Sequence, residues 1–170
     1  MPTKTTKTKK TAAKAAKKSG ELKVGDRAPA FDRPDDSGKR HKLSAYKGKT
    51  VVLYFYPKDD TPGCTIEACD FRDSFAEFTR SEAVVLGASC DSLASHRAFK
   101  RKFGLSFSLL VDEDGKLGTA YGVLKPQSYM GHMYMGVERT TFVIGPDGKI
   151  KRIFRQVNPQ GHASEVLDSL

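Results

Sequence analysis

The chain has 170 residues, of which 38% are hydrophobic, a formal net charge of +9 and three cysteines. This length suits one domain, and the absence of an apolar run near ~20 residues or of a secretory signal excludes a membrane protein, so we expect a soluble, cytoplasmic chain. Three cysteines are too few for a disulfide-stapled secreted scaffold, which favours reactive or buried thiols.

The positive charge is concentrated at the N-terminus. Residues 1–20 hold seven lysines and no acidic residue, and the rest of the chain has a net charge of only +2. Because this segment has no large apolar residue beyond Met1, we expect a disordered tail over 1–20 and one domain over 21–170. The tail could contact nucleic acid weakly, direct the chain to a nucleus or nucleoid, or only aid solubility.

From residue 21 onward, strand patterns alternate with helix patterns. Continuous apolar runs predict buried strands over residues 50–57, 83–89, 107–112 and 139–144. Apolar residues at near-helical spacing predict helices over 64–80 and 92–103.

The C-terminal part predicts a hairpin and a last helix. The turn GPDGK at 145–149 joins the strand at 139–144 to the sequence KIKRIF, and HASEVLDSL at 162–170 predicts a short helix. The whole order indicates an α/β fold in which helices cover both faces of a central mixed sheet.

The sequence TPGC places Cys64 after a buried strand and a turn, at the start of a helix. Free N–H groups and the positive end of the helix dipole favour a thiolate there. The Thr61 hydroxyl could hydrogen-bond the sulfur or an incoming oxygen, and Pro62 would exclude water. The alternative is that Cys64 is simply a small buried side chain.

Cys69 follows Cys64 by five residues, which is not the C-x-x-C spacing. On one continuous helix this step separates the Cα atoms by roughly 8.6 Å, whereas a disulfide needs them within about 7 Å. The two thiols can therefore bond only after the first turns unwind. Cys69 could instead be a thiol without a role.

The segments FYPKDDTPGCTIEACDFRD, HRAFKRKFGLSFSLLVDEDG and GVERTTFVIGPDGKI resemble the peroxiredoxins, specifically the peroxiredoxin Q or bacterioferritin comigratory protein subfamily. The similarity runs from about residue 22 to 170. It implies a thioredoxin-like fold and an atypical 2-Cys thiol peroxidase that reduces hydrogen peroxide and organic hydroperoxides, with thioredoxin as reductant and a monomeric chain.

The resemblance also implies roles for individual residues. Cys64 would be the peroxidatic cysteine and Cys69 the resolving one, joined in an intramolecular disulfide. Thr61, Pro57 and Arg139 would complete the active site, with no metal or organic cofactor.

Physical chemistry supports these roles. The guanidinium of Arg139 suits a thiolate and a polarised peroxide, and Glu67 could orient that arginine or be a solvated acid of the first helical turn. Cys90 carries no motif, and we expect a buried structural thiol. The histidines lack ligand spacing, which argues against a zinc site; they are His41, His96, His132 and His162.

Two other functions compete with the peroxidase. One is a nucleic-acid-associated protein that acts through its basic tail, and the other is a disulfide reductase of thioredoxin type. The lack of C-x-x-C, together with Thr61 and Arg139, argues against the reductase. The sequence leaves open the preferred hydroperoxide.

Overall fold

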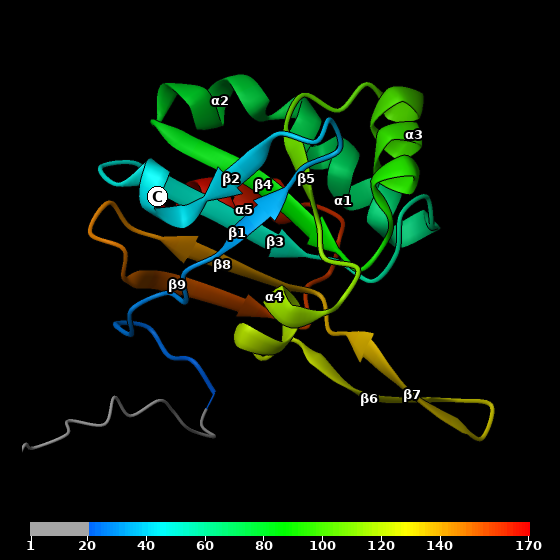
Figure 1. Cartoon of the computed structure of the whole chain (residues 1–170). Helices are drawn as coiled ribbons and strands as arrows, with labels where there is room; N and C mark the ends of the chain where they lie inside the picture. The colour runs from blue at the N-terminus through cyan, green and yellow to red at the C-terminus, as the bar shows by residue number, and fades with distance from the viewer. Residues whose placement is uncertain (1–20) are drawn as a thin grey trace, which may run out of the picture.

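The computed structural model describes residues 21–170, so the tail predicted over 1–20 lies outside the described residues. The centre of the fold is a five-stranded mixed sheet with the strand order β5-β4-β3-β8-β9 (Figure 1). Its strands are β3 (Thr50–Phe55), β4 (Ala83–Ser89), β5 (Ser108–Val111), β8 (Thr140–Ile144) and β9 (Ile150–Arg155). The three strands β3, β4 and β5 run parallel, and β8 is antiparallel to both β3 and β9. The four predicted strands and the closing hairpin are confirmed.

Alternate side chains of β3 enter two separate cores. Val52 and Tyr54 belong to one buried cluster, and Val51 and Leu53 belong to the other. A strand that is buried on both faces must be apolar at every position, which explains the continuous apolar run.

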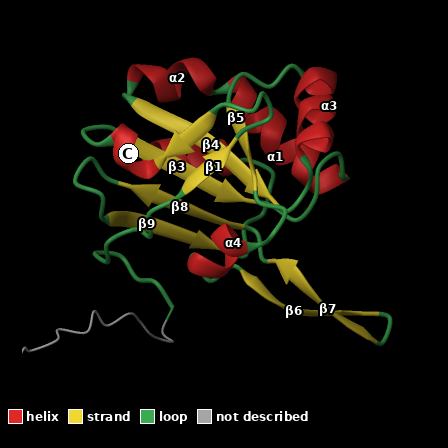
Figure 2. Ribbon diagram, viewed as in Figure 1, coloured by secondary structure: helices red, strands yellow, loops and turns green. Residues whose placement is uncertain are grey.

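Helices cover the two faces unequally (Figure 2). The first face carries α1 (Pro62–Asp73), α2 (Phe75–Arg80), α3 (Leu93–Phe103) and α5 (His162–Asp168), which contribute buried side chains to one cluster. The second face carries the short α4 (Lys116–Ala120) and the N-terminal segment around Phe31. This confirms an α/β sheet with helices on both faces.

The single helix predicted over 64–80 was wrong in its bounds. Helix α1 begins at Pro62, and the chain bends at Ser74 (φ −100°, ψ 7°) before α2. The bend has a packing cause: α1 packs against α5, α2 packs against β4, and each helix buries a phenylalanine, Phe71 and Phe78. The apolar spacing alone could not reveal that the two phenylalanines belong to separate helices.

Several elements were not predicted. They are β1 (Asp32–Pro34), β2 (Arg40–Lys42), the 3₁₀ helix Leu43–Tyr46, α4, and the hairpin of β6 (Leu124–Tyr129) and β7 (His132–Val137). Within residues 21–170, no helix is long and apolar enough to cross a membrane.

Candidate active site

Cys64 lies in the first turn of α1, at its third helical position. Thr61 is the extended N-cap residue and Pro62 opens the helix, where a missing N–H costs nothing. The first helical hydrogen bond runs from Thr65 N–H to the Thr61 carbonyl at 2.8 Å. The earlier N–H groups, including that of Cys64, thus have no helical acceptor, and they favour negative charge on the sulfur.

Arg139 reaches this helix start from the sheet. It directly precedes β8, whose first residue Thr140 pairs with Phe55 at the end of β3. Its Nη2 donates to Cys64 Sγ at 3.4 Å, and its Nη1 donates to Glu67 Oε1 at 2.7 Å. The fold therefore brings together the predicted Cys64, Arg139 and Glu67, although Arg139 stands outside the strand that was expected to contain it.

Gly63 allows the guanidinium to come this close. A Cβ atom at this position would lie 3.1 Å from Arg139 Nη2. Because Gly63 has no side chain, the Arg139 guanidinium can approach the start of α1 next to Cys64.

Glu67 is fully buried, so the alternative of a solvated acid is wrong. Burial raises its pKa to about 7, although the charge of Arg139 opposes this shift. Its Oε2 and the hydroxyl of Tyr54 are buried without hydrogen-bond partners. Burial, followed by the nearby Glu67 and Cys64, raises the pKa of Tyr54 well above its usual value.

Thr61 and Pro57 occupy the loop side of the site. The Thr61 hydroxyl donates to the Lys58 carbonyl at 2.9 Å, rather than to the sulfur. Its oxygen lone pairs can still accept a hydrogen bond from an incoming O–H group. Pro57 is exposed in the loop that follows β3.

The other two cysteines differ in setting. Cys69 is a half-buried free thiol on the same unbroken helix as Cys64, so the unwinding requirement argued from the sequence applies to this helix. Cys90 is half-buried rather than buried, and it packs against the second core cluster. Burial, helped by Asp112, raises the pKa of Cys90 and keeps it a thiol.

A buried polar network that the sequence reading missed holds the loop before Thr61. The Asp59 carboxylate contacts His96 Nδ1 at 2.7 Å and accepts from the hydroxyls of Tyr56 at 2.6 Å and Ser95 at 2.8 Å. Because His96 Nε2 also faces the Leu110 carbonyl at 2.8 Å, both ring nitrogens must carry protons to satisfy both acceptors. A histidine on the apolar side of the predicted helix 92–103 was the available signal.

The same network includes a group with metal-ligand chemistry. Ligand atoms of Asp59, Asp91 and His96 lie within 4.8 Å of one another. However, the Ser89 hydroxyl donates to Asp91 at 2.6 Å, and the Asp59 N–H donates to Asp91 at 2.8 Å. Protein donors already occupy these oxygens, so the group is better explained as a structural network.

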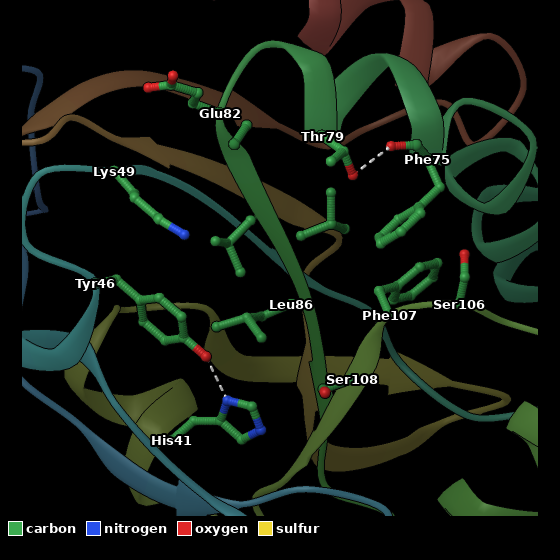
Figure 3. A pocket seen from close by; sticks show the side chains of 13 residues that line it. His41, Tyr46, Lys49, Phe75, Thr79, Glu82, Leu86, Ser106, Phe107 and Ser108 are labelled. Carbon is green, nitrogen blue, oxygen red and sulfur yellow. Dashed lines mark hydrogen bonds between the residues drawn. The ribbon is translucent and has the colours of Figure 1, made fainter.

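A separate pocket of about 280 Å³ shares no residue with this site. Its lining includes His41, Tyr46 and Lys49, and the Tyr46 hydroxyl and His41 Nδ1 form a hydrogen bond at 2.5 Å (Figure 3). The other ring nitrogen of His41, Nε2, lies 2.8 Å from the Asp35 carboxylate. This chain of bonds ties the strand β2 to the following 3₁₀ helix.

Comparisons with known proteins agree on one family. The model described as the AhpC/TSA family matches residues 24–153. The chain is 48% identical to Peroxiredoxin Bcp of Bacillus subtilis, over 88% of this chain and 95% of that protein. It is 41% identical to Peroxiredoxin Bcp of Escherichia coli, over 88% and 96% of the two chains.

Solved structures show the same likeness. A cysteine-to-serine variant of Xylella fastidiosa PrxQ superposes with a TM-score of 0.83 at 37% identity, over 88% of this chain and 96% of that chain. A bacterioferritin comigratory protein of Xanthomonas campestris, studied for alkyl peroxide reduction, gives a TM-score of 0.78 at 39% identity, over 82% and 88%. The thioredoxin-like fold is thereby confirmed.

Proposed function

The chain belongs to the AhpC/TSA family as a peroxiredoxin of the Bcp type, a thiol peroxidase, and we propose that Cys64 is the cysteine that attacks the hydroperoxide. The observation that carries this assignment is the 3.4 Å contact between Arg139 Nη2 and Cys64 Sγ at the start of a helix. Hydrogen peroxide and organic hydroperoxides are the substrates, in keeping with the alkyl peroxide reduction studied in the Xanthomonas campestris relative.

In the first step the Cys64 thiolate attacks one peroxide oxygen and the O–O bond breaks. The terminal O–H group passes to the sulfur, which is oxidised by two electrons to a sulfenic acid, and the other oxygen takes a proton from solvent and leaves as water or an alcohol. Arg139 is always charged, so it stabilises both the thiolate and the charge that develops on the departing oxygen. Glu67 holds the guanidinium, and the Thr61 oxygen accepts the O–H of the hydroperoxide.

In the second step the Cys69 thiol condenses with the sulfenic acid. A Cys64–Cys69 disulfide forms and water is released, once the first turns of α1 have unwound. A dithiol protein such as thioredoxin then reduces the disulfide by exchange. Since both cysteines are in one chain, a monomer is sufficient for the cycle. The location that we propose is the cytoplasm, where a dithiol reductant is present.

Anaerobic titration with hydrogen peroxide tests the assignment. The reduced protein should lose two thiols per peroxide, and peptide mapping should find Cys64 joined to Cys69. Cys64→Ser should lose no thiol at stoichiometric peroxide, whereas Cys90→Ser should behave as the parent does. A bridge to Cys90, or between two chains, would overturn the assignment of Cys69.

The nucleic-acid alternative rests on residues 1–20 alone and gains no support from these relatives. Deletion of residues 1–20 should leave peroxide turnover unchanged, because the residues proposed for catalysis all lie between Pro57 and Arg139.

A further inference from the structure

The hairpin β6–β7 carries an unusual concentration of exposed apolar side chains. It forms its own two-stranded sheet and projects from the body of the molecule (Figure 1). Among residues 21–170, seven large apolar side chains are exposed, and five of them belong to this hairpin: Tyr129, Met130, Met133, Tyr134 and Met135. Met133 and Met135 are 70% and 59% exposed.

Strand register places the two strand methionines on one face. Met135 lies opposite Pro126, and Met133 lies opposite Ser128. Side chains alternate along a strand and directly paired residues share a face, so these four residues lie on the same side. We call this side the Met face.

The Met face continues from the protein core. Leu124 and Val137 pair at the base of the hairpin, on the same side by the same alternation. Val137 is buried in the second core cluster, and Leu124 packs against that cluster. Along β7 the apolar side chains therefore continue from the core toward the tip of the hairpin, and Ser128 is the polar residue among the paired positions of this face.

The Met face is also uncharged. Residues 126–137 contain no Lys, Arg, Asp or Glu. The nearest charges, Lys125 and Glu138, pair with each other at 2.9 Å. Because an isolated two-stranded hairpin is only marginally stable in water, an exposed apolar face on one indicates a surface that a partner covers.

The position of the hairpin identifies which partner this is. Strand β7 leads through Glu138 directly to Arg139, which contacts Cys64. In Figure 1 the hairpin projects from the end of the sheet at which β3 ends and α1 begins. A protein seated on the hairpin thus lies near the helix that carries both cysteines.

The size of the Met face suits a transient partner. Its exposed side chains cover on the order of a few hundred Å², whereas a stable interface buries about 800 Å² on each partner. Weak electron-transfer complexes use smaller contacts, and flexible methionines adapt to different surfaces. These features favour a redox partner over a stable second copy of this chain.

We propose that the Met face docks the protein dithiol that reduces the enzyme, a thiol–disulfide reductant with an apolar surface around its reactive thiol. This inference rests on the proposed Cys64–Cys69 disulfide. One thiolate of the reductant attacks a sulfur of that disulfide, which frees one cysteine and forms a mixed disulfide. The second thiol of the reductant displaces the other cysteine, so both cysteines are reduced and the reductant leaves as a disulfide.

The test compares two reductants on the same full-length enzyme. In the double variant Met133→Ser/Met135→Ser, the ratio of thioredoxin-supported to dithiothreitol-supported turnover should fall about fivefold or more, through a higher KM for thioredoxin. Tyr134→Ser removes an exposed apolar side chain from the opposite face, and it should change this ratio less than twofold. Circular dichroism checks that all three proteins are folded.

Each other outcome has a defined meaning. An unchanged ratio in the double variant would overturn the docking proposal. A concentration-dependent dimer that sedimentation velocity detects in the parent and not in the double variant would assign the Met face to a second copy instead. Peptide mapping that finds turnover of the parent without a Cys64–Cys69 disulfide would refute the proposed disulfide cycle and with it this proposal, whereas an unchanged ratio refutes the docking surface alone.

Discussion

The guanidinium of Arg139 donates a hydrogen bond to the sulfur of Cys64 at 3.4 Å, although 75 positions separate the two residues in the chain. Arg139 precedes a sheet strand and Cys64 lies on a helix, so the contact exists only when β3 and β8 are paired and α1 is seated on the sheet. The electrostatic environment of the cysteine is therefore a property of the whole fold.

Replacement of Arg139 tests this relationship. Arg139→Lys retains the charge but loses the planar fork that reaches both Cys64 and Glu67. We expect the reaction of the reduced enzyme with peroxide to slow by about 10²-fold, the usual cost of removing a donor that stabilises developing charge. Rapid-quench thiol counting measures this rate, and a change of less than threefold would show that the fork is not needed.

Gly63→Ala should separate stability from activity. Alanine is favoured over glycine in a helix by up to about 1 kcal/mol, so the free energy of unfolding should stay constant or rise. The added Cβ would lie 3.1 Å from Arg139 Nη2 and displace the guanidinium by a few tenths of an ångström. We expect about tenfold slower reaction with peroxide. Thr79→Ala on α2 is the control for a changed helix propensity away from Arg139; it also removes the hydrogen bond of 3.1 Å from the exposed Thr79 hydroxyl to the Phe75 carbonyl.

Much of this arrangement could be predicted from the sequence, for identifiable reasons. The apolar run of β3 and the sequence TPGC are local signals, and they locate the strand, the turn and Cys64. The bend at Ser74 depends on how α1 and α2 pack on different neighbours, which no local pattern records.

The sequence left the role of Glu67 open between orienting the arginine and a solvated acid, and it did not identify the partners of His96. Both side chains are fully buried. The apolar side of the helix pattern gave a signal for the burial of His96, but nothing local gave one for Glu67. The partner of Glu67 is the residue that precedes β8, and the partner of His96 comes from the loop after β3. Such pairs join residues that are distant in the chain. A local sequence pattern predicts the strands and helices but not which side chains they bring into contact.

Glu67 should make stability depend on pH. Its pKa is raised from 4.5 to about 7 in the fold, so the folded chain holds this proton more tightly than the unfolded chain. The free energy of unfolding should therefore fall as pH rises from about 4.5 to 7, and stay level above. Glu67→Gln keeps an acceptor for Arg139 and removes the titration. The free energy of unfolding of the variant, measured in urea relative to that of the parent, should rise on the order of 2 kcal/mol from pH 5 to pH 8.

His96 should give a pH dependence in a higher window. Burial alone would lower its pKa, but the hydrogen bond and charge of Asp59 outweigh burial and raise it. The stabilisation is then complete below the unfolded value near 6.5, and it is lost as pH rises through the folded value. His96→Asn should lower the free energy of unfolding by about 3 kcal/mol at pH 6. The difference in this free energy between variant and parent should become smaller toward pH 9. A gap that widens with pH would contradict the charged Asp59–His96 pair.

The segment between the two cysteines should control how fast the disulfide forms. Ile66 is 47% exposed on α1, so its replacement changes helix propensity with little loss of core packing. Glycine disfavours a helix by about 0.9 kcal/mol relative to alanine. The first turns of α1 should therefore unwind more readily in the Ile66→Gly variant than in the Ile66→Ala variant. Since unwinding precedes disulfide formation, Ile66→Gly should convert the Cys64 sulfenic acid to the disulfide roughly fivefold faster than Ile66→Ala. Rapid quench after one equivalent of peroxide measures this step, and the pair Thr79→Gly and Thr79→Ala on α2 controls for general loosening. Equal rates in the two Ile66 variants would mean that Cys69 reaches Cys64 without unwinding of the helix.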